Sequence, residues 1–382
     1  MERLRERLYA GMAERGIEGE IADELYVKMK AFANYGFPES HSVSFAYLVY
    51  ASSWIKYHEP AAFCAALLNA QPMGFWSPHT LCQDARRHGV VVRSPDLVAS
   101  GSMAGLEAVH DAAGEAPGGA AVPDREIGPG QGDRQSGVAD GSQRELAVRL
   151  GLGSVRGIGS ELADEIEACR DADGPYSDAE DLVRRVPSLT LAQLESMATA
   201  GVFEASLGLD RRRALWTVGS VAQARQGTLP GIVTGERAPA LPEMSASEAA
   251  VADLWATGVA PTGHPTQFLR TQLAEHGVVT SAGLWEREPG GRVLVAGVVT
   301  HRQRPMTAQG TTFLNLEDET GLINVVVSKG CWARFRRVAR EAPAMLIRGR
   351  LERSEGVINI VAEHLAPLVV PGSTVHASRD FH

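Results

Sequence analysis

The sequence of 382 residues contains only four cysteines, and no two of them are close together: Cys64, Cys82, Cys169 and Cys331. It therefore lacks both the dense disulfide framework of small secreted domains and the C-x-x-C spacing of structural zinc sites. We expect free thiols in a reducing compartment. We also predict that this chain binds no metal ion and no cofactor.

Long hydrophobic runs are missing as well. The most apolar region, residues 43–68, is interrupted by polar and charged residues such as Lys56 and Glu59, so it cannot cross a membrane as one apolar helix. The charged N-terminus is not followed by the apolar stretch of a signal peptide. These absences predict a cytoplasmic protein.

The chain as a whole has no excess of positive charge, since its formal net charge is −9. This value excludes a uniformly basic protein that coats nucleic acid. The charge is uneven, because residues 1–290 sum to −13 and residues 291–382 sum to +4. The basic C-terminal quarter leaves room for one module that binds nucleic acid.

Hydrophobic residues spaced by three and four predict helices over residues 2–34, with a break at 16–19, and over residues 43–70, with a break at Pro60. We assign residues 1–100 to one helical domain. An aromatic stripe in the second stretch, which we interpret as core packing, consists of Tyr47, Tyr50, Trp54 and Tyr57.

Aromatic side chains are lacking altogether in residues 101–143, which contain ten glycines and three prolines. Such a segment buries too little apolar area to offset the loss of chain entropy on folding. We predict a disordered, low-complexity insert over residues 101–143, and most clearly over 110–143.

Helical patterning resumes over residues 144–230, where Val155-Arg156-Gly157-Ile158-Gly159-Ser160 precedes a helix. Glycines two residues apart allow a tight turn with positive φ angles, which brings backbone N–H groups close to an anion. Ser160 is expected to cap the following helix, whose N-terminus favours a phosphate. Arg156, Gly157, Ile158, Gly159 and Ser160 are therefore the predicted DNA-binding hairpin.

A second helix followed by an Ala-Gly-Val turn lies in residues 189–203. The two turns together predict a tandem helix-hairpin-helix domain, which contacts DNA phosphates and reads no sequence. Such turns are also ordinary helix starts, and the acidic residues Asp164, Glu165 and Glu167 oppose strong binding.

Residues 231–290 form a predicted connecting segment with short helices at 246–257 and 265–276. A two-residue period then predicts strands, with one helix at 332–340, at 292–302, 311–317, 322–327, 344–353 and 357–365. This β-β-β-α-β-β order is that of an OB-fold β-barrel, here residues 291–370, followed by a tail, residues 371–382.

An OB-fold binds ligands mainly on its second and third strands and the adjoining loops. On that face we predict binding of single-stranded DNA by Arg302, Arg304, Phe313, Asn315, Asn324 and Lys329, with Arg348, Arg350 and Arg353 nearby. Guanidinium groups bind phosphate, and Phe313 can stack on a base. A protein ligand, with Phe313 in the core, is the alternative.

No catalytic residue can be assigned in this chain. Asp171 and Asp173 have the spacing of a two-metal carboxylate pair, but solvated turn residues are the simpler interpretation of the acidic loop 170–175. The sequence thus predicts a multidomain α+β protein: a helical segment, a tandem helix-hairpin-helix domain and an OB-fold.

Several long motifs, in order along the chain, resemble bacterial C-family DNA polymerases of the polymerase III alpha-subunit type. They include Gly36-Phe-Pro-Glu-Ser-His-Ser, Trp54-Ile-Lys-Tyr-His-Glu-Pro and Ala147-Val-Arg-Leu-Gly-Leu-Gly-Ser-Val-Arg-Gly-Ile-Gly. Asn69-Ala-Gln-Pro-Met-Gly-Phe and Phe313-Leu-Asn-Leu-Glu-Asp-Glu-Thr-Gly are similar to the error-prone, DnaE-type branch. The resemblance covers nearly the whole chain except residues 110–143.

This resemblance implies that residues 1–100 are the C-terminal part of the polymerase fingers, where Ser40 and His41 help to hold the incoming nucleotide. Glu39 stands where many relatives have lysine, so one positive contact is lost. The family's palm, whose Asp residues bind two Mg²⁺ ions, precedes the fingers. We therefore expect a C-terminal fragment that has no catalytic residues of its own.

The resemblance also implies the partners: DNA, the remainder of the polymerase, mutagenesis accessory proteins and, through them, the sliding clamp. The resemblance further implies that the function is error-prone DNA synthesis in DNA repair and translesion synthesis. The alternative from the residues is a non-enzymatic DNA-binding or tethering module. A more remote one, an anticodon-binding OB-fold on an RNA enzyme, is opposed by the fingers-like loop.

Overall fold

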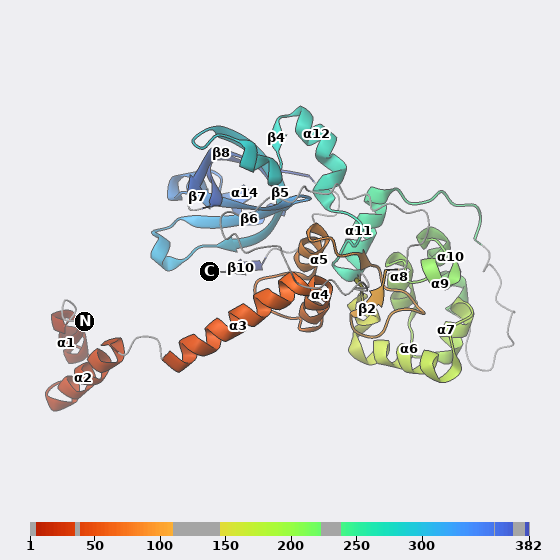
Figure 1. The fold of residues 1–382 in the computed structure, drawn as a ribbon, viewed down its shortest axis with the longest axis horizontal. Coiled ribbons are helices and arrows are strands. Elements are labelled where there is room, and N and C mark those ends of the chain that lie inside the picture. Colours follow the sequence, from red (N-terminus) through yellow and green to blue (C-terminus); the bar gives the residue numbers. More distant parts are fainter. Residues whose placement is uncertain are drawn as a thin grey trace, which may run out of the picture. The chain divides into compact units, whose positions relative to one another are not determined.

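The computed structural model describes residues 5–34, 39–109, 146–222, 238–354, 356–369 and 379–381. They belong to two compact units, residues 1–59 and 60–382, and combine helices with strands in the predicted α+β manner (Figure 1). Residues 110–143, the core of the predicted insert, lie outside the described residues.

The first unit contains α1 (Arg5–Ala13), α2 (Glu20–Asn34) and α3 (Glu39–His58). The predicted helices and their break are confirmed. Gly16 and Gly19 have φ values of +73° and +64°, which glycine adopts at no steric cost. The rings of Tyr9 and Tyr26 pack α1 against α2 with 5.5 Å between their centres.

The aromatic stripe of α3 is not in a core. Its exposed fractions lie between 50% and 74% for Tyr47, Tyr50, Trp54 and Tyr57. From His41 to His58 every side chain of α3 is exposed except the half-buried Ala51. The core interpretation is therefore wrong for the described residues, because helical spacing identifies a shared face but not what covers it.

The second unit begins with α4 (Pro60–Asn69) and α5 (Pro78–Arg87). These helices share an apolar core with a sheet whose strands lie in the order β1 (Val92–Arg93), β3 (Leu146–Arg149), β2 (Gly105–Ala108). The predicted domain boundary at residue 100 thus differs from the structure, which divides the chain after Glu59.

The start of the predicted insert at residue 101 is also too early. β2 pairs antiparallel with β3, and the side chain of Asn69 exchanges hydrogen bonds of 2.9 Å with the backbone N–H and C=O of Ala104. Because these contacts connect segments far apart in the sequence, the local composition could not reveal them.

The helical domain comprises η2 (Leu152–Ser154), α6 (Gly159–Asp173), α7 (Ala179–Arg185), α8 (Leu191–Thr199), α9 (Glu204–Leu207) and α10 (Arg211–Val221), drawn in yellow to green in Figure 1. Asp178, Thr190 and Asp210 cap α7, α8 and α10 by accepting hydrogen bonds from backbone N–H groups. One core unites both predicted hairpins, since it contains Val155, Ile158, Val202 and Phe203.

The connecting segment contains α11 (Ala246–Thr257), η3 (Pro265–Leu269), α12 (Arg270–Glu275), β4 (Val278–Val279) and η4 (Ala282–Glu286). The two predicted helices are confirmed. Ala256 of α11 joins the core of the helical domain, whereas β4 pairs with the first barrel strand. The segment therefore belongs structurally to both of its neighbours.

The barrel consists of β5 (Arg292–Gln303), β6 (Thr312–Asp318), β7 (Gly321–Val327), β8 (Ala344–Ser354) and β9 (Val357–Pro367), with η5 (Met306–Ala308), α13 (Lys329–Arg334) and α14 (Arg336–Glu341) between strands. The order β5-β6-β7-β9-β8 closes because β8 also pairs with β5. The predicted OB-fold topology is confirmed.

Two features of the barrel do not follow from the alternation of buried and exposed residues along its strands. A Cβ atom on Gly349 would lie 2.5 Å from the carbonyl oxygen of Val361, so only glycine fits beside the register shift at Arg348 and Gly349. The predicted tail includes a further strand, β10 (Arg379–Phe381), which pairs parallel with β5.

Candidate nucleic-acid interface

The first hairpin is an exposed turn that two buried apolar side chains attach to the core. Val155 and Ile158 are buried, whereas Arg156, Gly157 and Gly159 are exposed. Gly157 and Gly159 have φ values of +79° and +68°, which confirms the predicted left-handed backbone. A Cβ atom on Gly159 would meet no atom within 4 Å, whereas one on Gly157 would lie 3.7 Å from Gln193 Cγ, so the space beside Gly159 is open.

Helix α6 begins at this turn without a side-chain cap. Its N-cap residue is Ile158, which makes no side-chain hydrogen bond, and the helix already includes Ser160. The prediction that Ser160 is the cap is therefore wrong, because the helix starts one residue before it. Exposed first-turn N–H groups at a helix N-terminus carry partial positive charge and suit an anion.

Neighbouring helices hold the hairpin in place. Gln193 of α8 donates a hydrogen bond of 2.8 Å from Nε2 to the carbonyl oxygen of Gly157. The backbone N–H of Arg156 donates to the carbonyl oxygen of Ala256 at 2.7 Å. The Arg156 guanidinium lies 4.6 Å from the centre of the Trp255 ring, so the structure adds Gln193 and Trp255 to the residues that the sequence indicates.

The second hairpin has the same turn but a different environment. Gly201, with φ +76°, lies between α8 and α9. A Cβ atom there would lie 3.0 Å from Glu204 Oε2 and 3.2 Å from Arg211 Nε. Unlike the first hairpin, this turn is filled by the protein's own side chains.

Arg211 is buried and forms ion pairs with Asp253 at 2.7 Å and with Glu204 at 3.1 Å. Burial raises the pKa of Asp253 to about 6, although Arg211 lowers it. The carboxylate is thus held by one cation in a site that disfavours its charge.

On the barrel, Arg304 and Lys329 come together near the loop between β5 and β6, and Phe313 lies at the start of β6, where it pairs with Gln303 of β5. A Cβ atom on Gly310 would lie 3.5 Å from the Lys329 side chain and 3.8 Å from the Arg304 guanidinium. Phe313 is 38% exposed, so it is not a core residue. Arg304 also lies 5.6 Å from the ring centre of Trp332, which the sequence did not indicate.

Asn315 and Asn324 are cross-strand partners on β6 and β7, and their side chains form a hydrogen bond of 3.2 Å. The face predicted from the sequence therefore carries cations, an aromatic ring and amides. This combination suits a single strand, because cations contact its phosphates and an aromatic ring and amides contact its bases.

Arg302 does not belong to the predicted ligand-binding face. It is only 7% exposed, and its guanidinium donates to the carbonyl oxygens of Ala339 and Ala342. A register shift between Val299 and His301 interrupts the alternation of β5, so spacing along the strand misplaces Arg302. Its side chain supports the end of α14 and is not available to a ligand.

Arg348 and Arg350 are also misplaced. They lie on β8, where they pair with Leu294 and Arg292 of β5, and β8 borders β5 and β9 but neither β6 nor β7. The guanidinium of Arg353 donates to backbone carbonyls of residues 284, 285 and 287.

The fingers-like residues lie at the start of α3. His41 is exposed, and its ring centre is 4.5 Å from that of Phe45. Ser40 lies in the first turn of the same helix. Both belong to the unit of residues 1–59, and their nucleotide-binding role stays a prediction.

Asp171 and Asp173 lie in the last turn of α6. Their side chains are 69% and 70% exposed, and they lie near Arg170 at 3.5 Å and Arg185 at 4.0 Å, respectively. Among the residues that the structure describes, no three His, Cys, Asp or Glu side chains cluster as metal ligands would.

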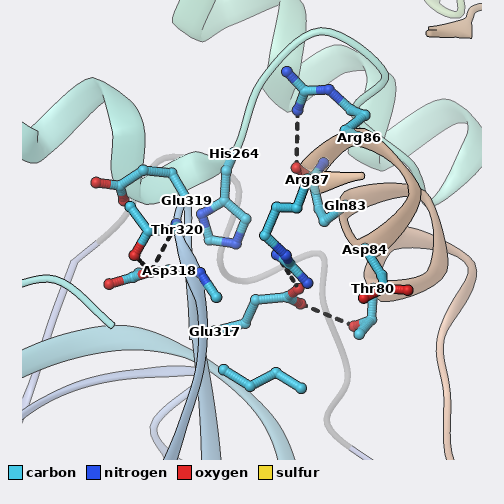
Figure 2. A network of polar contacts seen from close by, with 12 residues as sticks. Thr80, Gln83, Asp84, Arg86, Arg87, His264, Glu317, Asp318, Glu319 and Thr320 are labelled. Atoms are coloured by element: carbon cyan, nitrogen blue, oxygen red, sulfur yellow. Dashed lines mark hydrogen bonds and ion pairs between the residues drawn. The ribbon is translucent and has the colours of Figure 1, made fainter. Parts of the chain in front are cut away.

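The acidic residues of the motif Glu317-Asp-Glu-Thr-Gly connect the barrel to α5 and to η3 (Figure 2). The buried Glu317 carboxylate accepts hydrogen bonds from Thr80 Oγ1 at 2.9 Å and from Arg87 at 3.1 Å. Glu319 accepts from Arg270 and Thr266. This network, which we name the α5–barrel joint, gives these carboxylates a structural role.

Burial raises the pKa values of both Glu317 and Asp318 in this joint. Arg87 and a hydrogen bond from Thr80 act in the opposite direction on Glu317, and hydrogen bonds from Thr320 and Ser281 do so on Asp318. Asp318 accepts hydrogen bonds from the backbone N–H groups of Ser281, Thr320 and Gly321. Sequence spacing gave no sign of the joint, because the two partners of Glu317 are 230 and 237 residues away and those of Glu319 are 49 and 53 residues away.

Two family models match the chain. Residues 89–214 match a helix-hairpin-helix motif family, and residues 293–368 match a family of OB-fold nucleic acid binding domains. Among curated proteins, an error-prone DNA polymerase of Nocardia farcinica is 51% identical over the whole chain, and one of Mycobacterium tuberculosis is 48% identical. The chain is related throughout to error-prone DNA polymerases.

The chain spans 31% of the length of each of these two polymerase relatives. A solved asparaginyl-tRNA synthetase from Pyrococcus horikoshii shares 23% identity over 22% of this chain and 20% of that chain, with a TM-score of 0.18. That likeness carries no functional argument. No helix in the described part of the chain is long and apolar enough to cross a membrane.

Proposed function

We propose that this chain is the C-terminal DNA-binding segment of an error-prone DNA polymerase acting in DNA repair and translesion synthesis. The first hairpin binds the backbone of duplex DNA through N–H groups at the start of α6. The barrel binds the single-stranded template through Arg304, Lys329 and Phe313. The relationship to polymerases over the whole chain supports the family context.

The observation that carries this proposal is the open first hairpin. Its glycines are exposed, its helix N-terminus has no side-chain cap, and Arg156 adds a cation beside it. Phosphate groups of a duplex satisfy such N–H groups without any sequence requirement. The filled turn at Gly201 is assigned a structural role instead.

Catalysis is proposed to reside outside this chain. Nucleotidyl transfer needs carboxylates that hold Mg²⁺ ions at the primer end, and the exposed, ion-paired Asp171 and Asp173 do not supply such a site. Ser40 and His41 would add contacts to the incoming nucleotide. The palm, the accessory proteins and the sliding clamp complete the proposed assembly in the cytoplasm.

Two assays test the proposal. Fluorescence anisotropy of the full chain with a labelled primer–template should give saturable, salt-dependent binding. Primer extension with Mg²⁺ and all four nucleotides should give no product until a palm-bearing segment is added. Extension that is retained when both Asp171 and Asp173 are changed to Ala, and that co-purifies with this chain alone, contradicts the assignment of catalysis elsewhere.

A non-enzymatic tethering module is the second candidate, favoured by the two nucleic-acid-binding domains that match family models. It predicts the same DNA binding. It differs in that a palm-bearing segment would neither bind this chain nor gain extension activity from it.

A further inference from the structure

A cavity of about 570 Å³ lies on the outer wall of the barrel, on strands other than β6 and β7. Its lining includes Arg287, Arg292, Leu294, Arg348 and His364. None of these residues belongs to the face formed around Phe313, so the cavity is a separate feature of the barrel.

The strand register explains how the cavity forms. Val278 of β4 pairs with Leu294 of β5, Leu294 pairs with Arg348 of β8, and Arg348 pairs with His364 of β9. One row of residues therefore crosses four strands. Successive side chains alternate between the two faces of a strand, so Arg348 faces outward while Ile347 is buried in the core.

The charges on this wall are incompletely neutralised. Arg292 pairs with Glu363 at 3.0 Å, and Arg350 pairs with Glu352 at 2.8 Å. In the described part of the chain, the guanidinium groups of Arg287 and Arg348 have neither a hydrogen bond nor an ion pair. Two unpaired cations thus line the same cavity.

We propose that this cavity is a binding groove for phosphate groups. Guanidinium groups present paired N–H donors that match phosphate oxygens. Arg292 and Arg350 are direct cross-strand partners, and such like-charge pairs are unfavourable without counter-charges. Glu363 and Glu352 supply counter-charges to that pair, so a bound polyanion neutralises Arg287 and Arg348, which line the cavity. The groove goes beyond the proposed function, which needs only the first hairpin and the β6–β7 face.

Phosphate groups could come from the backbone of a single strand or from a free polyphosphate. The test therefore uses two probes with the full chain: a labelled oligothymidylate, followed by anisotropy, and inorganic pyrophosphate, followed by calorimetry. The variant is Arg287→Ala with Arg348→Ala. Arg337→Ala is the matched control, because the Arg337 side chain is 92% exposed and does not line the cavity.

The double variant should bind at least one probe about tenfold more weakly, and its salt slope for the oligonucleotide should fall by about 1.4, or ~0.7 per lost contact. Weaker oligonucleotide binding assigns the groove to nucleic acid, whereas a loss confined to pyrophosphate assigns it to free polyphosphate. Unchanged affinity for both probes overturns the proposal.

Two further variants keep the result interpretable. Changing both arginines to Lys should restore part of the affinity, and Arg348→Gln replaces the double variant if that variant fails to fold. Arg304→Ala with Lys329→Ala tests the β6–β7 face separately. A loss in the groove variant without a loss in the face variant would support the groove and contradict the proposed single-strand face.

Discussion

The guanidinium of Arg156 lies over the ring of Trp255, 4.6 Å from its centre. Arg156 belongs to the first hairpin, whereas Trp255 belongs to α11, about 100 residues later. The backbone N–H of Arg156 also donates to Ala256 of the same helix. The connecting segment therefore fixes the position of the hairpin that we propose to contact DNA.

Removing this ring should weaken duplex binding. Trp255→Ala is expected to lower the affinity about two- to fivefold, because an exposed cation–π contact contributes roughly 0.5–1 kcal/mol. Anisotropy with a labelled duplex measures the effect. Trp285→Ala is the control, since Trp285 of η4 contacts the barrel residue Arg353 in a similar way. An equal loss in both variants would refute a specific role for Trp255.

Arg302 and Arg304 should respond differently to substitution, although they are two residues apart. Arg304→Ala should reduce the salt slope of single-strand binding by about 0.7 and leave stability nearly unchanged. Arg302→Ala should destabilise the fold by roughly 2 kcal/mol or more, because it leaves buried carbonyl groups without donors. Salt titrations and urea unfolding distinguish them, and a stable Arg302→Ala protein would contradict the buried placement.

The stability of the protein should depend on the buried ion pair of the α5–barrel joint. Arg87→Ala is expected to cost about 3–5 kcal/mol in the free energy of unfolding, because Glu317 would remain buried without its cation. Arg337→Ala, which removes one side of an exposed pair with Glu341, should cost less than about 0.5 kcal/mol. Urea unfolding measures both values, and similar values for the two variants would contradict the joint.

The pKa of Asp253, raised to about 6, gives stability an unusual pH dependence. The native state binds the proton more tightly than the unfolded state, so this group's contribution is fully present below about pH 4 and is lost as the pH rises through 6. The loss is of the order of 2–3 kcal/mol. Comparing wild type with Asp253→Asn from pH 4 to 7 should reveal it, and parallel profiles would be inconsistent with the shift.

Local patterns in the sequence predicted the helices, the barrel topology and the positive φ angles of Gly157 and Gly159. The helices, the individual strands and the glycine turn depend on neighbouring residues, and the order of strands and helix along the chain indicates the barrel topology. The contacts of Gln193, Trp255 and Glu317 could not be predicted, because they join residues that are distant in the chain. Arg302 was misplaced for a different reason: one register shift in β5 changes which face its side chain takes.

The central claim, that the first hairpin binds duplex phosphates through its exposed backbone, is tested most directly by two matched glycine substitutions. Gly159 and Gly208 have φ values of +68° and +64°, and a Cβ atom on either would meet no atom within 4 Å. Alanine should therefore impose a similar backbone strain of about 1–2 kcal/mol at both positions. Duplex affinity measured by anisotropy should fall about tenfold for Gly159→Ala, since its hairpin N–H groups meet phosphate, and should stay at the wild-type value for Gly208→Ala. Equal affinities in the two folded variants would contradict the account.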